Sequence, residues 1–199
     1  MVKSTDCVHV HTMILYTIYK GNMNDREEMH MKIGFNEATA LECKGQSLMA
    51  DLEMCEKYGF DYIEIRFDCL KEYLKEHTLE ELAEWFGSHR LKPWAYNTLL
   101  YFNQRDEAGK QEVDEEVEFI LKVSKTIGLK MLITVPTCGV KDKTVSEICE
   151  EAVERLRYLS HKVGKDMRIS LEFCGAPDCS INQFGTAYDI VKEVDRDNV

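Results

Sequence analysis

The feature that most constrains this chain is a regular alternation of short apolar segments with longer segments of helical periodicity. From Met31 onward, five strand-like segments are each followed by a stretch whose apolar residues recur at helical spacing. Strands that alternate with helices in this way predict an α/β fold built on a parallel sheet. The five predicted strands are 32–39, 62–67, 92–97, 131–136 and 168–173.

The helical segments carry start signals as well as apolar stripes. Two of them begin at capping boxes, Thr78 with Glu81 and Thr144 with Glu147. Asn182 is a candidate cap for the last helix, with Phe184 expected to face inward. The five apolar stripes start at Leu48, Leu79, Val113, Val145 and Phe184.

Two architectures fit this alternation, a doubly wound open sheet and a (β/α)8 barrel. The first strand is followed by "FNEATALECKG", which has no G-x-G-x-x-G, and the chain has no phosphate-binding P-loop. The barrel is favoured because polar residues follow the carboxyl ends of the strands, where barrel enzymes build their active sites. These residues are Glu37, Glu64, Arg66, Asn97 and Glu172.

Glu172 stands near the end of the apolar segment "RISLEF". An isolated buried carboxylate is costly, so Glu172 is expected either to reach solvent at the strand tip or to meet a cation such as a metal ion. Glu64 and Arg66 are two residues apart on one strand and therefore share a face. They either pair with each other as a buried ion pair or line a polar pocket together.

Composition narrows the possible partners and surroundings. The 199 residues suit one domain, and a net charge of −11 disfavours binding to nucleic acid. The sequence has no apolar run of 18 residues, so no membrane-spanning segment is expected. Eight cysteines without a C-x-x-C pair indicate reduced thiols in a cytoplasmic protein.

Several segments together resemble one enzyme family. "KIGFNEATALE", "CEKYGFDYIEIR", "KPWAYNTLLYFNQRDE", "LITVP" and "LEFCGAPDCSINQFGTAYDIVKEVDRDNV" are similar to the xylose-isomerase-like TIM barrels of the sugar phosphate isomerase/epimerase group. The resemblance runs from Met31 to Val199 and is strongest to the isomerases of keto-inositols. It implies a divalent metal ion (Mn, Zn, Co or Mg) at the carboxyl ends of the strands.

The resemblance also implies roles for individual residues. Glu172 matches a family residue that ligates the metal, and carboxylates beside the metal shuttle the proton of an enediolate isomerisation, so Glu172 is expected to be both metal ligand and catalytic. The remaining family ligands, an Asp, a His and a Glu, belong to strands absent from this chain. From their strand positions, Glu64, Arg66 and Asn97 are expected to bind the substrate, a small keto-polyol or sugar.

The sequence is also compatible with three other functions. A ketose epimerase of the same family is one, and an endonuclease acting at abasic sites is another, although the acidic charge and the absence of His at strand ends argue against it. A non-catalytic fragment is the third.

The two ends of the chain carry separate expectations. Residues 1–30 are expected to be an N-terminal extension, disordered or absent from the native protein, with Met31 as the native start. Residues 31–199 are expected to form a barrel truncated at its C-terminal side to about five β/α units, compared with roughly 250 residues for a whole barrel. Such a chain is expected to self-associate or form a homodimer and to bind metal weakly.

Overall fold

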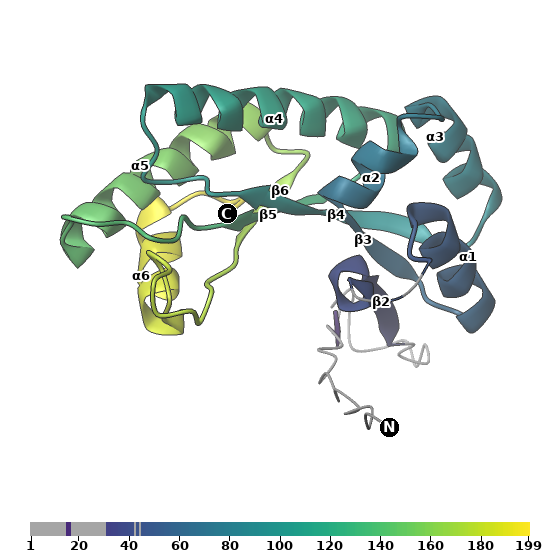
Figure 1. The fold of residues 1–199 in the computed structure, drawn as a ribbon, viewed down its shortest axis with the longest axis horizontal. Coiled ribbons are helices and arrows are strands. Elements are labelled where there is room, and N and C mark those ends of the chain that lie inside the picture. Colours follow the sequence, from purple (N-terminus) through teal and green to yellow (C-terminus); the bar gives the residue numbers. More distant parts are fainter. Residues whose placement is uncertain (1–14, 17–30, 42, 44) are drawn as a thin grey trace, which may run out of the picture.

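Five parallel strands form the centre of the molecule, in the order in which they occur along the chain (Figure 1). The computed structural model describes residues 15–16, 31–41, 43 and 45–199. A short strand, β1 (Leu15–Tyr16), pairs antiparallel with the edge strand β2. The parallel strands are β2 (Lys32–Asn36), β3 (Tyr62–Arg66), β4 (Lys92–Leu100), β5 (Met131–Val135) and β6 (Arg168–Leu171).

The strand order decides between the two architectures that the alternation allowed. A doubly wound sheet reverses its strand order at a switch point, whereas a barrel adds each new strand beside the previous one. Here β2 pairs with β3, β3 with β4, β4 with β5 and β5 with β6, all in parallel. The prediction of a barrel-type α/β fold is therefore confirmed.

Helices cover one side of this sheet. Figure 1 shows α4 running along the strands with α5 behind it, while no described helix covers the opposite side between β2 and α6. The apolar core lies between sheet and helices and includes Ile63 and Ile65 of β3. The helical elements are η1 (Glu37–Ala40), α1 (Leu48–Tyr58), α2 (Phe67–Tyr73), α3 (Leu79–Ser88), α4 (Glu107–Ile127), α5 (Val145–Val163) and α6 (Phe184–Val194).

Local signals in the sequence predict most of the helix starts correctly. Both capping boxes form, at Thr78 with Glu81 and at Thr144 with Glu147. The short helix α2 was not expected, because it follows β3 without a loop and is too brief for a clear apolar period.

The start of α6 corrects two predictions. Its N-cap is Gln183 rather than Asn182, and the cap makes no side-chain hydrogen bond. Phe184 is 68% exposed, because as the first residue of the helix it lies beyond the packed turn and contacts the rings of Phe173 and Tyr188 instead. The buried residues of α6 are Ala187, Ile190 and Val194.

The first and last predicted strands are shorter than expected. β2 ends at Asn36, whose side-chain oxygen accepts the Ala38 N–H at 2.9 Å and so starts the 3-10 turn η1. β6 ends at Leu171, which leaves Glu172 just beyond the strand. The first of these strands thus ends at a polar residue, and the second ends just before one.

A register shift in β4 determines which of its side chains face away from the helices. Pairing moves from Ile63 opposite Pro93 to Glu64 opposite Ala95, so Trp94 is an extra residue in β4. Trp94 contacts the ring of Tyr62, whereas Tyr96 is fully buried and donates its hydroxyl hydrogen bond to Glu116 of α4. Asn97 then lies opposite Arg66, beside Glu64.

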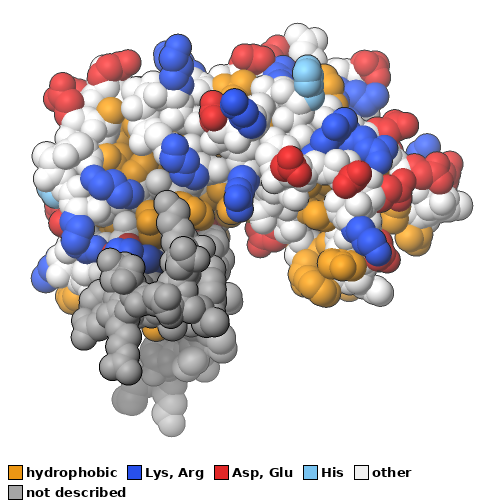
Figure 2. All heavy atoms as spheres, turned by 180° about the vertical axis from the view of Figure 1, so that it is seen from behind, with side chains coloured by type: hydrophobic (Ala, Val, Ile, Leu, Met, Phe, Trp, Pro, Cys, Tyr) orange, Lys and Arg blue, Asp and Glu red, His pale blue; other side chains and the backbone are white. Residues whose placement is uncertain are grey.

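Within the described residues, no helix is long and apolar enough to cross a membrane. Figure 2 shows Lys and Arg side chains gathered over the left and centre of one face, with hydrophobic side chains between them, whereas Asp and Glu side chains lie mostly on the right and along the upper rim.

Residues 1–14 and 17–30 lie outside the described part of the chain. The prediction that residues 1–30 are an extension falls almost entirely on them and stays a prediction.

Candidate functional site

Three polar side chains meet at the carboxyl ends of β2, β3 and β4. The Asn97 amide donates hydrogen bonds to the Asn36 side-chain oxygen at 3.2 Å and to the Glu64 carboxylate at 3.3 Å. Glu64 and Asn97 are only 3% and 9% exposed. The structure thus brings together two of the predicted substrate-binding residues, and it adds Asn36 to them.

Glu172 lies at the same end of the sheet, after β6. Its backbone N–H donates to the Thr134 carbonyl at 3.0 Å, which holds it beside β5. The residue is exposed, and the expectation that its carboxylate meets a metal ion stays a prediction. Partial loss of hydration is the main cause that raises the pKa of the Glu172 carboxyl, and the negative charge of Glu64 raises it further. Two carboxylates from β3 and β6 therefore influence each other across this end of the sheet.

Arg66, the last residue of β3, contacts the first turn of α2. Its guanidinium makes an ion pair with Asp68, with a hydrogen bond of 2.9 Å from Nε, and its side chain is 11% exposed. It lines a cavity of about 680 Å³ between α1 and α2. Other residues that line this cavity are Gln46, Ser47, Cys69, Tyr73 and His77. The prediction that Arg66 binds substrate stays a prediction, and its position associates it with this cavity.

A second pair of carboxyl groups is buried beneath Arg66. Glu37 of η1 is fully buried and accepts the Arg66 backbone N–H at 2.6 Å. Burial is the main cause that raises the pKa of Glu37, to about 8. The negative charge of Asp51 raises this pKa further, whereas the hydrogen bond from the Arg66 N–H lowers it. Burial also raises the pKa of Asp51, which accepts a hydrogen bond from Gln46 at 3.3 Å. This pair therefore holds a proton over part of the neutral range.

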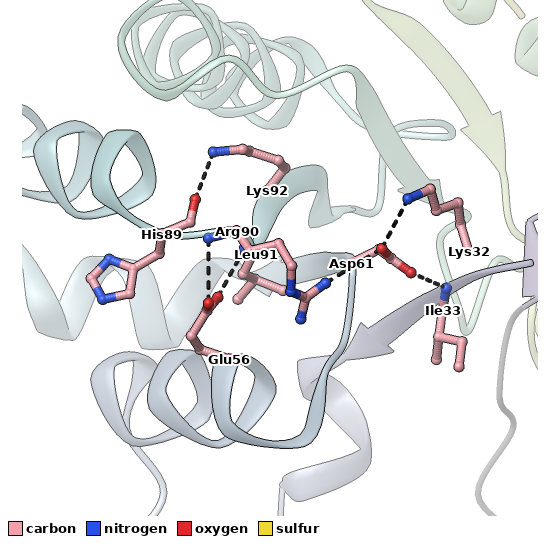
Figure 3. Close-up of polar contacts among 8 residues, drawn as sticks. All are labelled: Lys32, Ile33, Glu56, Asp61, His89, Arg90, Leu91 and Lys92. Atoms are coloured by element: carbon pink, nitrogen blue, oxygen red, sulfur yellow. Dashed lines mark hydrogen bonds and ion pairs between the residues drawn. The ribbon is translucent and has the colours of Figure 1, made fainter. Parts of the chain in front are cut away.

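The opposite end of the sheet carries charged groups of another kind (Figure 3). Asp61 accepts hydrogen bonds from the Lys32 ammonium at 3.1 Å and from the Ile33 N–H at 2.9 Å. Burial alone would raise the pKa of Asp61, but these donors outweigh it and the net shift is downward. Glu56 accepts the N–H of Leu91 at 2.9 Å, and this bond lowers its pKa. These contacts connect the segments of chain that lead into β2, β3 and β4.

The donor set at the carboxyl ends is incomplete as a metal site. Glu172 and Glu64 offer carboxylate oxygens, which suit divalent cations. The described residues contain no group of three His, Cys, Asp or Glu side chains that could hold a metal ion. Protein metal sites of the catalytic type use at least three side chains, so these residues alone do not match one.

Two residues of this region were missed from the sequence. Asn36 was missed because the strand was extended past it, although an Asn between a strand and an acidic residue is a typical cap. Asp51 was missed because it lies on a helix, one turn after the Ser47 cap, and its contact with Glu37 of η1 is a tertiary contact. The helical period places it beside Leu48 and Leu52 on the buried face.

Comparison with known proteins gives consistent matches. The family model of the xylose isomerase-like TIM barrel matches residues 52–199. The inosose isomerase of Bacillus velezensis is 46% identical over 171 residues, covering 85% of this chain and 60% of that protein. The inosose isomerase of Bacillus subtilis is likewise 46% identical over 171 residues, covering 85% and 61%. The chain therefore spans about 60% of the length of the curated relatives it matches.

A solved structure agrees with these sequence matches. The 1.8 Å crystal structure of the IOLI protein with a zinc atom superposes with a TM-score of 0.81 at 46% sequence identity. The match covers 85% of this chain and 61% of that one. The similarity thus extends from the sequence to the arrangement of the strands and helices described above.

Proposed function

This chain belongs to the xylose isomerase-like TIM barrel family, and on that premise we propose that the protein isomerises keto-inositols by moving a proton between adjacent carbons. The supporting observation is that two carboxylates, Glu172 and Glu64, face the same end of the sheet with Asn97 between β3 and β5. Relatives at 46% identity are inosose isomerases.

Glu172 is the proposed acid–base group. A carboxylate is a better general base when its pKa is shifted toward neutrality, and Glu172 has a raised pKa. It would remove the proton from the carbon next to the substrate carbonyl and return it to the neighbouring carbon. Its exposure leaves the carboxylate accessible to a substrate that approaches the strand ends.

Asn97 and Glu64 are proposed to orient the polyol. Both amide hydrogens of Asn97 are used by Asn36 and Glu64, so its side-chain oxygen is the group left to accept a bond from a substrate hydroxyl. A rigid amide held at both hydrogens can select the direction of one hydroxyl. Asn36 is then a positioning residue, because it acts through Asn97.

We also propose Glu172 as one ligand of a divalent metal ion, as the resemblance implies. A bound ion would stabilise negative charge on the substrate oxygens. The IOLI structure supports zinc as the metal to test first. The described residues supply too few donors for tight binding, so we expect this chain alone to bind zinc weakly.

The test uses 2-keto-myo-inositol in deuterated water, followed by NMR. The protein is assayed alone and together with the part of the Bacillus subtilis relative that it does not match. We expect deuterium to enter at the carbon beside the carbonyl, and Glu172→Gln to lower that rate by about 100-fold or more. Glu53→Gln, the same change at an exposed position of α1, is the matched control.

Two results would overturn the proposal. The first is no exchange under either condition while the protein is folded and zinc is present. The second is turnover of free ketoses with none of keto-inositols, which would indicate an epimerase instead.

A further inference from the structure

Two cysteines from different loops face each other beside the candidate site. Cys138 lies in the loop after β5 and Cys179 in the loop after β6, and they form an isolated antiparallel bridge. The flanking hydrogen bonds run from the Gly139 N–H to Asp178 at 2.8 Å and from the Ser180 N–H to Thr137 at 2.9 Å. The two loops are therefore joined through backbone bonds on both sides of the cysteine pair.

The position of these bonds determines the kind of pair. Because the bonds connect the residues before and after each cysteine, Cys138 and Cys179 are a non-hydrogen-bonded pair. In such pairs the Cα atoms are about 4.5 Å apart and the side chains lie closer than in the other type. A disulfide requires Cα atoms about 4.4–6.8 Å apart, so this site satisfies the requirement at its short end.

A third thiol lies beside the pair. Cys174 donates its N–H to the Ile181 carbonyl at 3.2 Å, in the same loop as Cys179. Burial raises the pKa of Cys174 to about 11, with contributions from Cys179 and from the charge of Glu172. The three sulfur atoms and the Glu172 carboxylate thus belong to one neighbourhood.

We propose that Cys138 and Cys179 form a reversible disulfide that ties the β5–α5 loop to the β6–α6 loop beside Glu172. All seven described cysteines are free thiols, which is the reduced form of this site. The partly exposed Cys138 is the entry point for the oxidant, because Cys179 is only 4% exposed.

The reaction uses a low-molecular-weight disulfide such as glutathione disulfide. The Cys138 thiolate attacks one of its sulfur atoms, forms a mixed disulfide and releases one glutathione thiol. The Cys179 sulfur then attacks Cys138, and the second glutathione leaves as a thiol. Two cysteine thiols are oxidised and one glutathione disulfide is reduced. Excess thiol reverses both steps.

The test oxidises the whole chain with glutathione disulfide at alkaline pH, because burial raises the pKa of Cys138 and slows its reaction at neutral pH. The remaining free thiols are blocked with an alkylating agent before mass spectrometry, and a residual mixed disulfide is recognised by the added mass of one glutathione. We expect the protein to lose the mass of two hydrogen atoms and a non-reduced digest to contain one peptide linking Cys138 to Cys179. Dithiothreitol should restore both thiols.

Serine variants separate this pair from the other thiols. Cys138→Ser and Cys179→Ser should each abolish the linked peptide, whereas Cys174→Ser and Cys43→Ser should keep it. A digest in which Cys138 and Cys179 remain alkylated after oxidation would overturn the proposal. So would a digest whose cross-link joins Cys174 to Cys179 in the unmodified chain.

Discussion

The two ends of the sheet treat carboxyl groups in opposite ways. Before the strands, Asp61 and Glu56 accept backbone and cationic donors, and their pKa values are lowered. After the strands, Glu37 and Glu172 lose hydration or face other carboxyl groups, and their pKa values are raised. Barrel enzymes keep stability at the first end and chemistry at the second, and this chain shows that division in its electrostatics.

The largest effect that this comparison predicts is at Glu37. Glu37→Ala removes the acceptor of the Arg66 backbone N–H and leaves a cavity at a fully buried position, so we expect a loss of about 3 kcal/mol in the free energy of unfolding. Glu37→Gln keeps an oxygen for Arg66 and should cost much less. Urea unfolding of both variants measures the difference, and equal losses would show that the bond to Arg66 is unimportant.

The pH dependence of stability is the second effect. The folded protein holds a proton on Glu37 up to a pKa of about 8, whereas the unfolded chain releases it near 4.5. Between these values the folded state binds more protons, so stability falls as pH rises, by about 1.4 kcal/mol per pH unit for one proton. Glu37→Gln should flatten this slope. Unfolding curves from pH 5 to pH 8 measure it, and a stability that rises through this window would contradict the prediction.

At the opposite end of the sheet, substitution of Asp61 should change stability less, and the contribution of Asp61 to stability should depend on pH in the opposite direction. The lowered pKa of Asp61 contributes stability that is present above its unfolded pKa and is lost as pH falls through the lower, folded pKa. Asp61→Asn should cost less than about 1 kcal/mol, because the side chains of its partners Lys32 and Arg90 are each 46% exposed. Added salt should reduce the difference between variant and parent. A salt-independent loss would indicate that the Ile33 bond dominates.

The smallest effect on stability should be at Glu172. Glu172→Gln removes repulsion with Glu64 at an exposed position, so we expect a change within about 0.5 kcal/mol, toward greater stability. The same variant should have the largest effect on proton transfer, which separates a functional carboxylate from a structural one. Thermal unfolding beside the Glu53→Gln control measures the first part. A clear destabilisation would place Glu172 with Glu37 as a structural group.

The sequence predicted the elements better than the directions of their side chains. Period and capping boxes are local, so the existence and order of the five strands and the starts of α3 and α5 were correct, although several strand ends were not. Glu64, Asn97 and Glu172 were expected at one end of the sheet because parallel strands share that end.

Directions depend on tertiary contacts that a linear pattern does not contain. Arg66 shares a strand with Glu64, yet its ion pair is with Asp68, because α2 begins immediately after β3. The extra residue at Trp94 changes which side of the sheet Tyr96 and Asn97 face, and no local sequence pattern predicts it. Phe184 was expected inside because its spacing fits the stripe, although the helix begins there and its first turn is exposed.

The agreement between strand order and chain order has a consequence for how this protein acquires its structure. Each parallel strand finds its partner in the segment made just before it, so every pairing closes one short loop of chain. Strand β4, the longest and the central one of the five parallel strands, should be the last to exchange its amide hydrogens with solvent. The sheet can therefore grow by one strand and one helix at a time as the chain leaves the ribosome.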